Sequence, residues 1–320
     1  MRIDIHDVGH GHCAVVTAPD GTRLMIDCGS DPVRGWWPSI HYWRQHIDVL
    51  VLQNLDEDHV TDLTDMWRHV SIGAIVTNPT ITAQALSTMK RDRGMGTGVR
   101  FAHTLIEASQ PGLVHGQLPL SDAGGVNASV MWNRYGVDFA DTNNLSIATF
   151  VEYGPFVALF TGDLEKKGWQ ALLTNPSFAS KLSRVTVLVA SHHGRENGCC
   201  AEAFGFMRPD IVIFSDDTIK YESQDTIGWY RQRTKGIPDS TKSVNYLTGP
   251  SIRRVLTTRR DGSISIGVAR GGRYIVTTER DAGTHFLPSP VGIGLNYLGR
   301  SVGSEAVGLG GASNWLSGRS

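Results

Sequence analysis

The sequence predicts an α/β fold in which two β-rich halves form an internally duplicated sandwich with helices outside. Three observations carry this prediction: apolar runs of strand length recur in both halves, segments that suit helices alternate with them, and several apolar runs end directly in Asp or His. We expect residues 1–285 to form one large domain. The Gly/Ser-rich C-terminal tail, 286–320, is expected either to be flexible or to dock on a protein partner.

The composition narrows the choice of partner and compartment only slightly. The chain carries 30 Lys and Arg against 31 Asp and Glu, so no overall positive field indicates nucleic acid. Its 4 cysteines show no paired CxxC spacing, which favours a reducing compartment. No apolar run approaches the length of a membrane span, and no apolar leader opens the chain. We therefore expect a soluble, cytoplasmic protein without a membrane partner.

The first half opens with a pattern typical of a β-meander. Residues 1–7 alternate apolar and polar side chains, and Gly9 and Gly11 predict a tight turn before the next strand. The expected elements are strands at 1–7, 13–18, 23–26, 49–52 and 74–77, a short helix within the Trp-rich stretch 30–47, and helices at 63–70 and 82–90. The basic, glycine-rich stretch 90–100 is expected to be a solvated loop.

The second half restarts the same alternation of strands and helices. The expected elements are strands at 128–132, 146–152, 156–160, 185–190 and 211–214, and a helix at 164–173. Residues 254–257 and 263–268 flank the turn Arg260-Asp261-Gly262, so we expect them to pair as a late hairpin.

Metal-ligand residue types follow the apolar strands repeatedly. They are Asp27, then Asp56, Asp58 and His59, then Asp163, then His192 and His193. Alone, each has an ordinary explanation as a helix cap, a solvated turn or a buried core residue. Because the strands of a sheet bring their ends together, the repetition predicts one shared site. Oxygen and imidazole ligands without thiolate suit Zn, Mn or Fe, and Asp163 could bridge two ions.

The order of these motifs resembles the metallo-β-lactamase fold and, within it, the hydrolase domain of ComEC-type competence proteins, over about residues 1–270. The matching motifs are Asp7-Val8-Gly9-x-Gly11, LMIDCG at 24–29, Asp56-x-Asp58-His59, Asn143-Asn144-Leu145-Ser146, TGDLE at 161–165, Ser191-His192-His193-Gly194 and TRRDGSI at 258–264. The resemblance implies a four-layer αββα sandwich and a metal-dependent hydrolase that uses one or two Zn²⁺ or Mn²⁺ ions.

The resemblance also implies roles for single residues. Asp58 and His59 would hold one ion with bridging Asp163 and either His192 or His193, and Asp56 would belong to a second ion. Asp27 would orient a ligand, and Asn143 and Asn144 would line the cleft. The sequence departs from the family at Asn54, where His is usual, and an amide is a poorer zinc ligand than imidazole. His10 and His12 would either replace that ligand or act as general acid, unless they only support the site.

The leading hypothesis is a phosphodiesterase or nuclease in which a metal-bound hydroxide attacks phosphorus and His10, His12 or Lys166 protonates the leaving oxygen. Seven basic residues could follow a nucleic-acid backbone or simply be solvated charges: Arg231, Arg233, Lys235, Arg253, Arg254, Arg259 and Arg260. Two alternatives stay open. One is a binding or regulatory subunit with a degenerate site, and the other is a protease or ester hydrolase on the same fold.

Overall fold

The computed structural model describes residues 1–108, 122–219, 222–239 and 249–280. The chain divides into two units, Met1–Ser289 and Pro290–Ser320, and all described residues belong to the first. The predicted tail at 286–320 lies outside the described residues, so its flexibility or docking stays a prediction. In the described ranges, no helix is long and apolar enough to cross a membrane.

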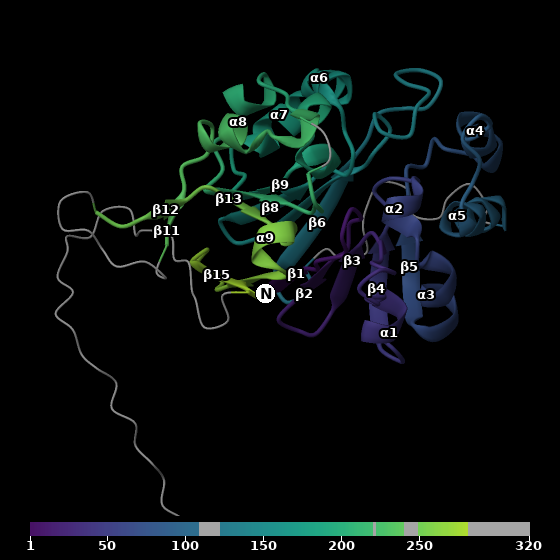
Figure 1. Cartoon of the computed structure of the whole chain (residues 1–320), viewed down its shortest axis with the longest axis horizontal. Coiled ribbons are helices and arrows are strands. Elements are labelled where there is room, and N and C mark those ends of the chain that lie inside the picture. The colour runs from purple at the N-terminus through teal and green to yellow at the C-terminus, as the bar shows by residue number, and fades with distance from the viewer. Residues whose placement is uncertain (109–121, 220–221, 240–248, 281–320) are drawn as a thin grey trace, which may run out of the picture. The chain divides into compact units, whose positions relative to one another are not determined.

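Two large sheets form the centre of the first unit (Figure 1). One has seven strands in the order β15-β14-β1-β2-β3-β4-β5: Tyr274–Thr278, Ile264–Val268, Arg2–Ile5, Ala14–Thr17, Arg23–Ile26, His46–Val51 and Ser71–Val76. The other has six in the order β13-β10-β9-β8-β7-β6: Val255–Thr257, Ile211–Phe214, Val187–Val189, Phe156–Phe160, Ala148–Tyr153 and Val126–Met131. A two-stranded ribbon pairs β11, Ile237–Pro238, with β12, Ile252–Arg253. The predicted meander is confirmed, since β1, β2 and β3 pair antiparallel.

Helices cover the outer faces of both sheets. Beside the first sheet lie α1 to α5: Pro38–His41, Glu57–Val60, Leu63–His69, Ala83–Met89 and Thr97–Ala108. Beside the second lie α6 to α8: Lys166–Leu173, Pro176–Leu182 and Ile227–Arg231. The described part of the chain also contains four 3₁₀ turns, η1 to η4: Ser191–Gly194, Glu196–Gly198, Ala203–Gly205 and Glu222–Gln224.

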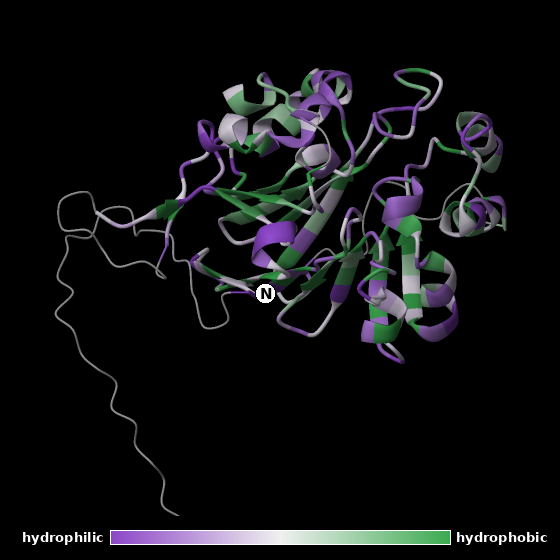
Figure 2. Ribbon diagram, viewed as in Figure 1, coloured by the Kyte–Doolittle hydropathy of each residue, from purple (hydrophilic) through white to green (hydrophobic). Residues whose placement is uncertain are grey.

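The strands are apolar on both faces because both faces are covered. In β8, Phe156 and Phe160 pack into a core shared by the two sheets, whereas Leu159 packs outward with Trp169 of α6. In the first sheet, Met25 of β3 likewise points into the cluster beneath the helices. Figure 2 shows the resulting hydrophobic colouring of the strands. The layers are therefore helix, sheet, sheet, helix, which confirms the predicted αββα sandwich.

The predicted late hairpin is wrong. β13 pairs parallel with β10 in the second sheet, whereas β14 pairs antiparallel with β1 in the first. The short helix α9, Thr258–Asp261, separates them and ends at Gly262, whose φ of 71° favours glycine. The chain does turn at Arg260-Asp261-Gly262, as predicted. The strands on either side of the turn, β13 and β14, pair in different sheets and not with each other.

The predicted solvated loop at 90–100 is only partly correct. Residues 91–94 are exposed, but the Lys90 side chain is only 10% exposed and α5 already begins at Thr97. The Glu57 carboxylate of α2 accepts hydrogen bonds from the backbone N–H groups of Gly98 and Val99, at 2.9 and 3.1 Å. A carboxylate at this end satisfies free N–H groups of the first turn. A tertiary contact therefore starts this helix.

Candidate metal centre

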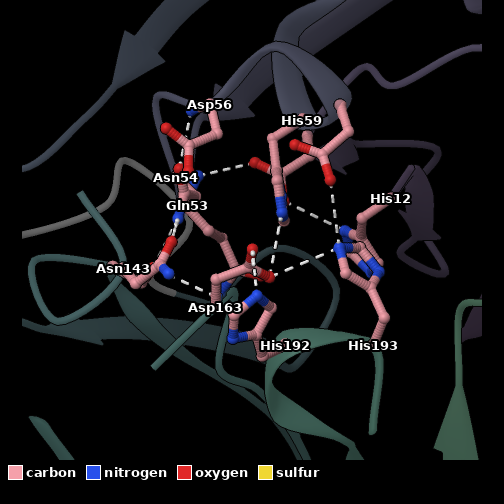
Figure 3. Close-up of polar contacts among 12 residues, drawn as sticks. His12, Gln53, Asn54, Asp56, His59, Asn143, Asp163, His192 and His193 are labelled. Atoms are coloured by element: carbon pink, nitrogen blue, oxygen red, sulfur yellow. Dashed lines mark hydrogen bonds and ion pairs between the residues drawn. The ribbon is translucent and has the colours of Figure 1, made fainter. Parts of the chain in front are cut away.

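Four metal-ligand side chains meet where strands of both sheets end. Asp58 and His59 lie on α2 after β4, Asp163 follows β8, and His193 lies on η1 after β9. One ligand atom from each lies within 4.8 Å of the others. Figure 3 shows His59, Asp163 and His193 pointing toward one another. The sequence prediction that these strand ends converge agrees with this geometry.

The contacts inside this four-residue group suit a cation better than they suit hydrogen bonding. His59 Nε2 lies 3.0 Å from Asp163 Oδ1, and His193 Nε2 lies 3.3 Å from Asp58 Oδ2 and 3.4 Å from Asp163 Oδ1. Yet His59 Nε2, His193 Nε2 and Asp163 Oδ1 are buried and make no hydrogen bond among the described residues. Buried polar atoms without a partner are costly, and a divalent ion among them would remove that cost. The donor set therefore fits Zn, Mn or Fe.

Asp27 holds the His59 ring by Nδ1, the nitrogen opposite the one that faces Asp163. Its carboxylate is fully buried, Oδ2 accepts from Nδ1 of His59 at 2.7 Å and of His12 at 3.1 Å, and Oδ1 accepts from the Gln53 backbone N–H at 2.6 Å. A proton held on His59 Nδ1 leaves Nε2 free to coordinate. Burial alone would lower the pKa of His59, but the Asp163 and Asp27 carboxylates outweigh it and raise that pKa well above its ordinary value.

The structure distinguishes between the two histidines that the sequence left open. His193 donates Nδ1–H to the Ser215 carbonyl at 2.7 Å, which directs Nε2 into the four-residue group. His192 lies outside the group, with Nε2 at 3.8 Å from Asp163 Oδ2. Both residues have positive φ, 51° for His192 and 55° for His193. Such backbone is unusual for these residues and is typical of functional sites.

His10 and His12 occupy different positions. His12 is buried and bonded to Asp27, in a second group that consists of His12, Asp27 and His59. His10 packs against His193 with ring centroids 4.7 Å apart and ring planes tilted by 36°, and its Nε2 lies 2.7 Å from Arg195 Nη2. Burial, with the neighbouring His193, lowers the pKa of His10 to about 4. The sequence analysis did not single out Arg195, although it follows the histidine pair by two residues.

The remaining predicted residues form a hydrogen-bonded network beside the four-residue group. Asn54 Oδ1 accepts from the Asp56 N–H at 2.6 Å, and Asn54 Nδ2 donates to Ser146 Oγ at 3.1 Å and lies 3.4 Å from Asn143 Oδ1. The Asp56 carboxylate accepts from Thr142 Oγ1 at 2.8 Å and forms an ion pair with Lys90. Asp56 is not a member of the four-residue group.

Asn144 supports the loop and does not line the site. Its Oδ1 accepts from the Gly168 N–H at 2.8 Å, and its Nδ2 donates to Asp141 at 3.1 Å. Asn144 is buried, and these contacts fasten the segment before β7 to the start of α6.

Several of the basic residues proposed to follow nucleic acid have protein partners. Arg253 Nη2 lies 2.7 Å from Asp261 Oδ1, Arg259 pairs with Asp216, and Lys235 Nζ lies 3.0 Å from Asp210 Oδ1. Each of these three residues has a carboxylate partner within the fold, so its presence is explained without a nucleic acid.

Two facing sheets with outer helices and a carboxylate–imidazole group at their strand ends define a metallo-β-lactamase fold with a candidate metal site. Over 237 residues the chain is 24% identical to ComE operon protein 3 of Bacillus subtilis (strain 168), a match that covers 67% of this chain and 28% of that protein. This agrees with the resemblance to ComEC-type hydrolase domains. The chain thus matches less than a third of that relative's length. No protein-family model matches the chain.

The chain is also distantly similar to several solved structures, including two from Bacillus subtilis and Streptomyces venezuelae. The metallo-β-lactamase fold protein YhfI from Bacillus subtilis is 10% identical with a TM-score of 0.43, covering 82% of this chain and 99% of that one. CmlA, a diiron β-hydroxylase from Streptomyces venezuelae, is 12% identical with a TM-score of 0.44, covering 80% of this chain and 53% of that one. Because both scores are below 0.5, the fold assignment depends on the sheets and strand ends described above.

Proposed function

We propose that this protein is a metal-dependent hydrolase of phosphodiesters, with nucleic acid as its substrate class. The observation that carries the proposal is the four-residue group of Asp58, His59, Asp163 and His193, whose ligand atoms converge; in the last three residues a buried ligand atom makes no hydrogen bond among the described residues. A bound Zn²⁺ or Mn²⁺ ion supplies Lewis-acid polarisation and a lowered pKa of water at neutral pH. Neither ion is favoured over the other by this donor set.

The residues around the group position the ligands and favour an anionic substrate. Asp27 and the Ser215 carbonyl hold the ring protons of His59 and His193 on Nδ1, so each Nε2 is directed to the ion position. The cations of Lys90 and Arg195 flank the site, the first through Asp56 and the second through His10. Fixed cations near the reacting centre stabilise the charge of a phosphate.

His10 is the residue that we assign to contact with the leaving oxygen. Arg195 can only donate a hydrogen bond, so His10 Nε2 accepts it and the ring proton resides on Nδ1. In this neutral state the ring can donate the Nδ1–H as a hydrogen bond to a leaving oxygen. His12 is not available for this role because it is buried and bonded to Asp27.

Cleavage of labelled single-stranded and double-stranded DNA and RNA in the presence of Mn²⁺ or Zn²⁺ tests the proposal. We expect cleavage by the wild type, loss of cleavage in Asp58→Ala, and retention in the matched control Asp65→Ala, whose half-exposed carboxylate pairs only with Arg68 among the described residues. Equal cleavage by Asp58→Ala and wild type would refute the site assignment.

A second candidate, a binding or regulatory subunit, is favoured by one observation, the network in which Asn54 and Asp56 already have protein partners. Binding of nucleic acid without cleavage by metal-loaded protein would support it. Cleavage of an ester or a peptide without cleavage of nucleic acid would instead replace the proposed substrate class.

A further inference from the structure

A lysine ammonium is paired with a carboxylate that the family resemblance assigns to a second metal ion. Lys90, the residue that follows α4, forms an ion pair with Asp56, which belongs to that second ion together with the bridging Asp163. Its side chain is 10% exposed, and the carboxylate oxygen that it contacts also accepts a hydrogen bond from Thr142.

The neighbouring amides offer this position no free oxygen. The Asp56 N–H can only donate, which fixes Asn54 Oδ1 as its acceptor and turns Asn54 Nδ2 toward Ser146 and Asn143. Asn143 Oδ1 faces that Nδ2, and its own Nδ2 donates to Glu165 at 3.2 Å. The amide oxygens at the second position are therefore engaged in hydrogen bonds, and the Asp56 carboxylate is already paired with the Lys90 ammonium, whose positive charge repels a cation.

We propose that Lys90 replaces the second metal ion, so that the centre binds a single divalent ion at the four-residue group and uses the Lys90 ammonium, held by Asp56, as its second positive charge. The binding of a single ion is a property of the metal site alone. The second part, in which the Lys90 charge acts on a substrate phosphate, rests on the proposed function. The ammonium of a lysine is a compact point charge, and unlike a metal ion it does not have to be bound from solution.

Counting ions tests the replacement directly. Protein stripped with EDTA is brought to equilibrium by dialysis against Mn²⁺, and bound metal is measured by inductively coupled plasma mass spectrometry. We expect a single ion per wild-type chain and none in His59→Ala. Two ions per wild-type chain would overturn the replacement and leave the proposed hydrolase intact, whereas no ion would overturn both. This count requires no variant at Lys90, so misfolding of a variant does not affect it.

Variants at the second position then test whether the Lys90 ammonium is what keeps a second ion from binding. The triple variant Asn54→His, Lys90→Ala, Asn143→His supplies imidazole ligands and removes the ammonium, so we expect it to bind a second ion. If this variant folds correctly and still binds one ion, repulsion by Lys90 is not the cause.

Lys90→Met is expected to keep the single ion and to lose about 100-fold in kcat for a phosphodiester, as loss of one charge-stabilising group commonly does. Lys90→Arg should retain most activity. The exposed Lys167→Met is the matched control, and equal rates in Lys90→Met and Lys167→Met would refute the role of the charge.

Discussion

Replacing Asp27 with Asn tests whether the orientation of His59 determines metal affinity. The substitution keeps the size of the side chain, and Asn tolerates the left-handed backbone that Asp27 adopts, with φ of 57°. The Gln53 N–H needs an acceptor, so the single amide oxygen stays there and the NH₂ group faces His59 Nδ1. Nδ1 must then accept, and the ring proton moves to Nε2, the atom directed to the ion.

We expect Asp27→Asn to weaken metal binding, because the proton on Nε2 blocks the atom that would coordinate the ion. Removing a partner that orients a metal ligand typically costs 10- to 100-fold in affinity, about 1.4 to 2.7 kcal/mol. We expect the upper end for Asp27→Asn, because the substitution turns one of the four ligand atoms into a donor. Affinity for Mn²⁺ or Zn²⁺ is measured by competition with a chromophoric chelator. Asp62→Asn is the control, since that buried carboxylate accepts from the Ser39 N–H at 2.6 Å and lies outside the group. Unchanged affinity in folded Asp27→Asn would refute the reasoning.

Three further predictions concern packing, acid stability and metal linkage. A Cβ at Gly29 would stand 2.3 Å from the Asp58 carbonyl oxygen, so Gly29→Ala should displace Asp58 and weaken metal binding in the same competition assay; native affinity would contradict this. Burial lowers the pKa of His6, which is bonded to Tyr42, to about 4 from 6.5. The unfolded chain therefore takes up the proton first, and stability that is complete above pH 6.5 is lost as the pH falls toward 4, by at most about 3 kcal/mol. His6→Phe should flatten that slope in urea unfolding, and an unchanged slope would refute the assignment. Free Mn²⁺ at 100 times its Kd should stabilise the wild type by about 2.7 kcal/mol in thermal unfolding and leave Asp58→Ala unaffected; an equal shift in both would place the ion elsewhere.

Local signals in the sequence accounted for the sandwich and for the convergence of ligands. Apolar runs such as Val49–Leu52 identify buried strands, and Asp or His directly after a strand must lie at a sheet edge. This reasoning brought Asp58, His59 and Asp163 together although more than a hundred residues separate the first from the last. The alternation of period two also explains why β8 packs on both faces.

Contacts made by tertiary packing could not be predicted in this way. Lys90 meets Asp56 across 34 positions of the sequence because α4 and α5 fold back over α2, and nothing in the stretch 90–100 indicates it. The choice of His193 over His192 depends on left-handed backbone and on the Ser215 carbonyl. The late hairpin failed for the same reason, because a turn signal does not specify which sheet accepts the next strand.

The central claim is that an ion binds between Asp58, His59, Asp163 and His193. An anomalous difference map from a crystal soaked in Mn²⁺ tests this claim most directly. We expect one peak within coordination distance, roughly 2.0 to 2.3 Å, of oxygen or nitrogen atoms from all four side chains. No peak there, or a peak centred instead between Asn54 and Asp56, would contradict the account.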